Sequence, residues 1–480
     1  MTIKRYFATA DNTITNAYKE NLITRGTGSN MGQADILEVF SIYGQATTSS
    51  AEASRILLQF DTTSIDSDRT AGTIPASGSV KFYLNMFNTP HAETLPVDFT
   101  LTVSAVSQSW EEGLGLDMET YADLSYNSTG SNWIRRGTLG TWDTEGGVYY
   151  TDTNSSFEQV FSEGYEDLSI DVTTLVEQWV DSAGNVLGSK NNCGFGIRLT
   201  GSQETESRSF FTKKFFARSS EFFHDRPVLE ARWEATVKDD RGSFFASSSL
   251  ASADDNLHTL YLYNRVKGRL KNIPNIGANP IFVSLYEEAG GTQIGSNFFT
   301  GSHVSAGIYK CQVYADTTDT SIIDVWHSAS VEYHTGSITV SSLTAEASSP
   351  SDKYILKISD AKNYYKNDGF ERFRLYIRPR NWSPNIYTVA KSTPETTTIH
   401  SASYEVFRIM DNKLVVPHGT GSTLHTLMSY DVGGNYFDLD MDMLEAGYDY
   451  GIRFSFYDDY TTSWKDQSYE FRFKVRQNEY

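Results

Sequence analysis

The 480-residue chain lacks most of the features that mark a secreted or membrane-bound protein. Its two cysteines, Cys193 and Cys311, are too few for the disulfide framework of a secreted multidomain protein, so we expect both thiols to be small core residues. No stretch approaches the roughly 18 consecutive apolar residues of a membrane-spanning helix, and the first residues contain no apolar signal-peptide segment. These absences predict a protein that is made in a cytoplasm and has no membrane partner.

Positive charge is also scarce. The chain has 40 Lys and Arg residues against 60 Asp and Glu residues, which gives a formal net charge of −20. A protein that binds a phosphate backbone needs a basic surface, and no cluster of Lys and Arg is dense enough to outweigh this total. The sequence therefore predicts no nucleic-acid partner and a water-exposed, self-repelling surface.

Catalytic motifs are absent from the sequence as well. The nine histidines form no HExxH pattern and no zinc-binding spacing with the cysteines, and no G-x-S-x-G nucleophile turn occurs. The 60 acidic residues do not single out a carboxylate pair for glycoside hydrolysis. We therefore expect a protein that is not an enzyme and needs no cofactor.

Strand-forming residues, in contrast, are plentiful. Aromatic residues make up 14% of the chain and hydrophobic residues 39%, and such side chains suit a pleated, half-buried surface. Apolar and polar residues alternate in short runs bounded by Gly, Pro, Asn, Asp or Ser, as in SRILLQFDT (54–62) and in the pair GYDYGIRFSFYDD (447–459) and QSYEFRFKV (467–475). The pattern predicts an all-β protein built from tandem antiparallel β-sandwiches.

Two turn-prone polar stretches divide the predicted strands into three groups. VKDDRGS lies near residue 240, and EASSPSD covers residues 346–352. The sequence therefore predicts a jelly-roll-like sandwich over 1–240, an immunoglobulin-like sandwich over 241–345 and a C-terminal sandwich over 346–480.

One segment departs from the strand pattern. In LSIDVTTLVEQW (168–179) the apolar residues fall at the i, i+3, i+4 and i+7 positions of a helix, ending at Trp179, and Asp171 precedes them as an N-cap. We predict one short helix in the first domain.

A long loop, residues 110–147, interrupts the strands of the first domain and carries candidate binding residues. Trp110, Trp133 and Trp142 are candidates for an aromatic platform that stacks on a sugar ring. The alternative is that these tryptophans fill the core and brace the loop.

The same loop carries candidate metal ligands. Glu111, Glu112 and Asp117 have the carboxylate oxygens that Ca²⁺ prefers. The alternative is a hydrated loop held by Gly113 and Gly115, because a calcium site needs more oxygen ligands than these three side chains supply.

The first domain resembles the DNRLRE-type β-sandwich, a carbohydrate-binding-module-like fold of surface and structural proteins. The matching segments are GSNMGQADILEVF (28–40), SRILLQFD (54–61), SWEEGLGLD (109–117), GTWDTEGG (140–147), LSIDVTTLVEQW (168–179), CGFGIRLTG (193–201) and RPVLEARW (226–233). The resemblance implies that the helix caps an open end of the sandwich, with Trp179 packed beneath it.

The layout of the whole chain resembles virion structural proteins of marine T4-like bacteriophages, on the stretches RYFATADNTITNAYKENL (5–22), TKKFFARSSEFF (212–223) and NLHTLYLYNRVKG (256–268). This resemblance implies a structural component of a virion, in a tail, neck, baseplate or head surface, that is synthesised in the host cytoplasm. Its partners would be other virion proteins and copies of itself. A module that binds host surface glycan is the alternative, and a depolymerase ranks third.

Overall fold

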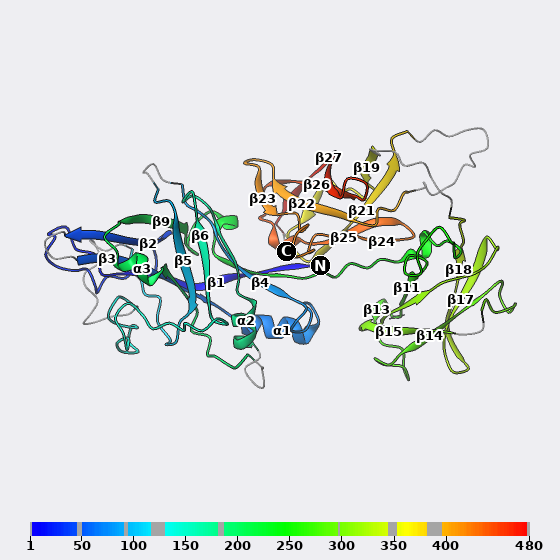
Figure 1. Ribbon diagram of the computed structural model, residues 1–480, viewed down its shortest axis with the longest axis horizontal. Coiled ribbons are helices and arrows are strands. Elements are labelled where there is room, and N and C mark those ends of the chain that lie inside the picture. Colours follow the sequence, from blue (N-terminus) through cyan, green and yellow to red (C-terminus); the bar gives the residue numbers. More distant parts are fainter. Residues whose placement is uncertain are drawn as a thin grey trace. The chain divides into compact units, whose positions relative to one another are not determined.

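The computed structural model describes residues 2–45, 50–90, 95–116, 130–180, 187–295, 298–343, 353–381 and 396–477. Its contacts divide the chain into two compact units, Thr2–Glu234 and Ala235–Tyr480. Strands dominate both units (Figure 1), so the predicted all-β class is confirmed. Both cysteines are buried and free, as expected.

The first unit contains ten strands, three short α-helices and one 3₁₀ turn among its described residues. The strands are β1 (Ile3–Thr15), β2 (Ile36–Gln45), β3 (Ser50–Phe60), β4 (Lys81–Met86), β5 (Phe99–Ala105), β6 (Ser156–Phe161), β7 (Leu168–Asp171), β8 (Phe195–Leu199), β9 (Phe210–Phe216) and β10 (Val228–Arg232). The helical segments are α1 (Thr63–Ala71), α2 (Thr173–Val180), α3 (Gly201–Thr205) and η1 (Phe223–Asp225).

Eight of these strands have the order of a jelly roll. One sheet runs β1-β10-β4-β7 and the other runs β3-β8-β5-β6, which is the arrangement of two interleaved Greek keys. Strand β1 belongs to both sheets, because Ile3–Phe7 pair with β10 and the residues from Ala8 onward pair with β3. A register shift between Ala8 and Ala10 marks the point where β1 passes from one sheet to the other. Strands β2 and β9 form an additional pair beside β3.

The predicted helix is present as α2. Asp171 ends β7, and its side chain accepts a hydrogen bond from the backbone N–H of Thr173 at 3.0 Å. Trp179 is buried, with its ring centroid 4.8 Å from that of Phe195 in β8. The sequence analysis predicted one helix in the first domain, but the described residues contain three, because α1 and α3 are also helical. Helix α1 escaped prediction because it buries only Ile65 and therefore has no apolar stripe.

The second unit contains two groups of strands. The first group is β11 (His258–Tyr263), β12 (Arg265–Val266), β13 (Arg269–Leu270), β14 (Ile281–Tyr286), β15 (Phe299–Ser305), β16 (Ile308–Val313), β17 (Ser321–Ser328) and β18 (Val331–Thr339), preceded by the 3₁₀ turn η2 (Asp240–Gly242). The second group is β19 (Tyr354–Ile358), β20 (Tyr364–Lys366), β21 (Phe370–Pro379), β22 (Ala402–Arg408), β23 (Lys413–Val416), β24 (Ser429–Asp431), β25 (Gly434–Asp440), the 3₁₀ turn η3 (Met441–Met443), β26 (Asp449–Asp458) and β27 (Ser463–Arg476).

Each group folds its sheets around an aromatic core. In the first group, the first residues of β15 pair with β14 and its last residues pair with β16. Strand β15 therefore connects the two sheets, and the core between them contains Tyr309 and Trp326. In the second group the sheets β19-β21-β25-β24 and β20-β27-β26-β22-β23 face each other. Rings from the two sheets meet there, with the centroids of Tyr404 and Phe437 3.9 Å apart.

The stretch near residue 240, interpreted from the sequence as a break, binds both groups of strands. Tyr430 of β24 donates its backbone N–H to Val237 at 2.9 Å, and its hydroxyl donates to Asp240 at 2.8 Å. The other carboxylate oxygen of Asp240 accepts the backbone N–H of Thr259 in β11 at 2.7 Å. Polar residues here therefore hold the two groups together, and a division of the chain into three domains stays a prediction.

Candidate functional site

The tryptophans of the long loop do not form an exposed platform. Trp133 and Trp142 are only 7% and 5% exposed, and they pack in a small apolar core with Ile14 and Leu57. The indole N–H of Trp142 donates to the carbonyl of Asn132 at 2.8 Å, and that of the partly buried Trp110 donates to Cys193 at 2.9 Å. The prediction of an exposed aromatic platform was therefore wrong. The tryptophans lie under the loop, because there the rings are buried and the indole N–H groups find hydrogen-bond acceptors.

Arg55 of β3 attaches the loop to the sandwich. Its guanidinium lies 5.0 Å from the ring of Trp133 and donates to the carbonyl of Gly146 at 2.8 Å. Two further hydrogen bonds, of 2.9 and 2.7 Å, join it to the carboxylate of Glu204 in α3. Such a bidentate pair fixes geometry as well as charge, so the loop has a rigid base.

The candidate calcium ligands do not converge. The carboxylate of Glu111 accepts hydrogen bonds from the hydroxyl and the backbone N–H of Thr138, and these bonds lower the pKa of Glu111. Glu112 instead pairs with Arg218, 2.6 Å from Nη2 to Oε2. Asp117 lies outside the described residues. Glu111 and Glu112 have different partners, and no group of three metal-ligating side chains occurs in the described part of the chain. Because Asp117 is not among the described residues, the predicted calcium site stays a prediction.

Glu112 belongs to a buried charge cluster that the sequence analysis missed. Asp11 of β1 is fully buried, and its carboxylate accepts the backbone N–H of Arg218 at 2.7 Å. Burial, the largest cause, and the charge of Glu112 together raise the pKa of Asp11 to about 7, although the backbone hydrogen bond and the charge of Arg218 oppose this rise. Glu112 also accepts the backbone N–H of Asp11 at 2.9 Å, so the cluster ties β1 to the long loop.

Asn30 joins a second loop to the long one. Its amide nitrogen donates to the carbonyls of Glu112 and Ser131 at 2.6 and 2.7 Å, and its amide oxygen accepts from Gly115 at 2.9 Å. Position 113, next to Asn30, requires a glycine. The φ of Gly113 is +89°, and a Cβ on Gly113 would lie 2.4 Å from the Asn30 side chain. The two loops are therefore held together by a dense set of hydrogen bonds.

These joined loops expose large apolar side chains, which we call the apolar loop surface. Its members and their exposed fractions are Leu22 (63%), Ile23 (82%), Leu114 (68%), Leu116 (50%) and Leu139 (47%). Large exposed apolar side chains on loops that are held by many hydrogen bonds are typical of surfaces that contact another protein. These residues were visible in the sequence, but their exposure and the hydrogen bonds that join the two loops were not.

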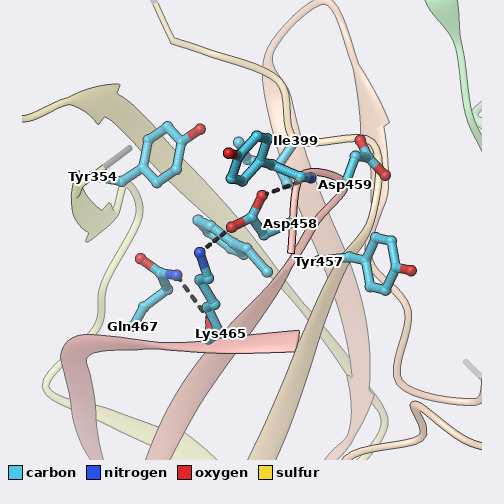
Figure 2. Close-up of a pocket in the computed structure, with 9 residues that line it drawn as sticks. Tyr354, Ile399, Tyr457, Asp458, Asp459, Lys465 and Gln467 are labelled. Carbon is cyan, nitrogen blue, oxygen red and sulfur yellow. Dashed lines mark hydrogen bonds and ion pairs between the residues drawn. The ribbon is translucent and has the colours of Figure 1, made fainter. Parts of the chain in front are cut away.

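The second unit has a pocket at the turn between β26 and β27 (Figure 2), with a volume of about 230 Å³. Aromatic residues, acids and amides share its lining, which consists of Tyr354, Ile399, Phe456, Tyr457, Asp458, Asp459, Tyr460, Lys465 and Gln467. The sequence analysis did not find it, because Tyr354 and Ile399 are distant in the chain from the hairpin. The run YDDY (457–460) in a turn was the one available signal.

Internal contacts preorganise this pocket. Asp458 forms an ion pair with Lys465 and accepts the backbone N–H of Tyr460 at 3.0 Å. The hydrogen bond from Lys465 lowers the pKa of Asp458 to about 2, so this carboxylate is ionised at neutral pH. Tyr460 is 70% exposed, which leaves its ring open to a ligand beside the exposed Asp459.

Comparisons with known proteins find no matching family model and no matching curated protein. Among solved structures, the N-terminal Ig1-2 module of the Drosophila receptor protein tyrosine phosphatase DLAR is 6% identical, with 47% of this chain and 91% of that chain covered and a TM-score of 0.14. The Yersinia pseudotuberculosis adhesin InvE is 12% identical, with 45% and 54% covered and a TM-score of 0.15. A bacterial ice-binding adhesin is 8% identical, with 80% and 88% covered and a TM-score of 0.16.

Likenesses at such TM-scores carry no argument about the fold or the function of this chain. Within the described residues, no helix combines the length and the apolar character needed to cross a membrane.

Proposed function

We propose that this chain is a non-enzymatic structural component of a bacteriophage virion, in a tail, neck, baseplate or head surface, and that it acts by binding other virion proteins and copies of itself. The resemblance of the first domain and of the chain layout to such proteins supports the proposal. The apolar loop surface is the observation that carries it, because the side chains of Leu22 and Ile23 are exposed without a packing role in the unit.

Assembly must overcome the repulsion between acidic chains. With a formal net charge of −20, two copies repel each other unless contact buries enough apolar surface or pairs enough charge. Burying an exposed leucine or isoleucine contributes roughly 1.5–3 kcal/mol, so a few such residues on preorganised loops contribute substantially to a contact. Holding the loops in place beforehand also lowers the ordering cost of binding.

The test is mass spectrometry of virus particles purified from cultures that carry this gene, with the copy number per particle measured. We expect the wild-type chain in washed particles and fewer copies of a Leu22→Ser/Ile23→Ser variant. Because both side chains are exposed, the variant should keep its stability within roughly 0.5 kcal/mol. Met410→Ser, which alters a 71% exposed side chain of the second unit, is the matched control. Absence of the chain from particles would refute the proposal.

Glycan binding is the second candidate function, and the pocket between β26 and β27 favours it. Aromatic rings that stack on sugar faces, together with a few fixed polar groups, are the usual chemistry of a saccharide site. Tyr460 offers an exposed ring. Asp459 and Gln467, labelled in Figure 2, have side-chain groups that can hydrogen-bond to hydroxyls. The proposed glycan site is therefore in the second unit and does not include the buried tryptophans of the first unit.

Calorimetric titration with purified host surface polysaccharide tests this second candidate. We expect saturable binding that weakens at least tenfold in Tyr460→Ala, which corresponds to the loss of roughly 1.4 kcal/mol of stacking. Tyr165→Ala, a 59% exposed tyrosine of the first unit, should bind as wild type. No binding by the wild-type protein would leave assembly as the remaining role.

A further inference from the structure

A buried lysine of the first unit contacts a side-chain amide. Lys213 of β9 is 1% exposed, and its amine lies 2.7 Å from the side-chain oxygen of Asn88, which follows β4. Asn88 is the bridge partner of Phe215, two residues beyond Lys213 on the same face of β9. The amine also donates to the carbonyls of Gly164 and Glu166, each at 2.8 Å.

Burial of the amine lowers its pKa, although the neighbouring rings and oxygen acceptors favour its charged form. The rings of Phe161 and Phe215 flank it, with centroids 5.1 and 4.9 Å away. Burial lowers the pKa of Lys213 to about 8, against the opposing charges of Asp167 and Glu166. A neutral lysine amine is a nucleophile, and desolvation is one of the ways proteins activate it.

A carboxylate lies beside the same asparagine. Asp167 accepts the backbone N–H of Asn88 at 2.7 Å, and its charge acts on Lys213 as well. Amine, amide and carboxylate therefore lie close together. An amine in contact with the amide oxygen is near the roughly 3–3.5 Å separation from which nucleophilic attack on the adjoining carbon proceeds.

We propose that Lys213 and Asn88 join in an intramolecular amide cross-link. The neutral Nζ attacks Cγ of Asn88, so that an Nζ–Cγ bond forms and the Cγ–Nδ2 bond breaks. The departing nitrogen takes a proton from the attacking amine and leaves as ammonia, and the carboxylate of Asp167 carries that proton. The reaction consumes no oxidant and no cofactor.

The cross-link would connect positions 125 residues apart in a chain whose cysteines are free. It would give the first unit a covalent restraint that forms in a reducing cytoplasm, where disulfides do not persist. The competing state is an unreacted ammonium, whose three donors the three oxygens satisfy. The two states differ in mass, so they are directly distinguishable.

Intact mass spectrometry of the full-length purified protein is the test. We expect a mass lower than that of the sequence by one ammonia, and fragmentation that places the link between the peptides containing Asn88 and Lys213. Lys213→Arg and Asn88→Ala should each restore the full mass, and Asp167→Asn should slow the loss. Lys214→Arg, which changes the adjacent lysine paired with Glu38, should leave the cross-link intact.

The wild-type mass is decisive even if the variants fold poorly. A folded wild-type protein that keeps its full mass after prolonged incubation at pH 8 would overturn the proposal, as would an ammonia loss located at another residue.

Discussion

Replacing Arg241 with alanine is expected to destabilise the second unit by about 3–5 kcal/mol, the cost of leaving a buried charge without its partner. Arg241 forms two hydrogen bonds with Asp324 of β17, of 2.6 and 2.7 Å. Asp324 is fully buried, and burial alone would raise its pKa, but the hydrogen bonds and the charge of Arg241 outweigh burial and hold the pKa low. Without Arg241 the Asp324 carboxyl would either stay ionised in the core without a partner or take up a proton as burial raises its pKa, and both states cost stability.

Urea denaturation gives the change in the free energy of unfolding, and hydrogen exchange of β17 assigns it to this unit. Arg372→Ala is the matched control, since Arg372 makes the same two-bond contact with Asp438 but its side chain is 50% exposed. Exposed pairs contribute roughly 0–1 kcal/mol. Equal losses in the two variants would contradict the argument that burial decides the cost.

A second experiment separates the net contribution of the Arg241–Asp324 pair to stability from the cost of removing only one partner. Changing Arg241 to methionine and Asp324 to leucine together removes both charges. Replacement of a buried pair by apolar side chains is often neutral. We therefore expect the double variant to recover most of the stability that Arg241→Ala loses, apart from the 2.8 Å hydrogen bond from the Trp326 indole to Asp324.

Alternation of apolar and polar residues was sufficient to predict most strands, because a half-buried sheet needs that period. The same reasoning missed β1, where Asp11, Asn12 and Thr13 are all buried. Asn12, for example, donates its side-chain amide to Ser131 of the long loop at 2.9 Å. Polar residues of this strand are inside the protein because they hold loops that come from distant parts of the sequence.

The candidate sites were harder to predict for the same reason. Trp133 in a glycine-rich loop has the same local sequence whether its ring is exposed or buried, and only the approach of Arg55 and of the apolar core decides between them. Likewise, the contact between Lys213 and Asn88 depends on the jelly-roll order of strands that are far apart in the chain. Sequence periodicity predicts which face of a strand is buried, but it does not predict which residues from other parts of the chain pack against that face.

The buried Asp11 should make the first unit less stable as the pH rises. Its pKa is about 7 in the folded protein and about 3.8 in an unfolded chain, so between these values the folded state holds a proton that the unfolded state has lost. Stability is therefore highest below pH 4, falls through the window from 4 to 7 and is level above it. Asp11→Asn keeps an acceptor for the Arg218 N–H and removes the ionisation.

We expect Asp11→Asn to be more stable than wild type at pH 8 by at most about 4 kcal/mol, since one pKa unit corresponds to about 1.4 kcal/mol. The difference should vanish toward pH 4, and unfolding of both proteins in urea across this range measures it. Asp143→Asn, which changes an exposed acid of the long loop, should follow the wild-type curve. A variant less stable than wild type at pH 8 would mean that the attraction of the ionised Asp11 to Arg218 exceeds its desolvation cost, so that its pKa in the folded protein lies below 3.8. The charge cluster would then stabilise the loop base above about pH 4, and this contribution would be lost in acid.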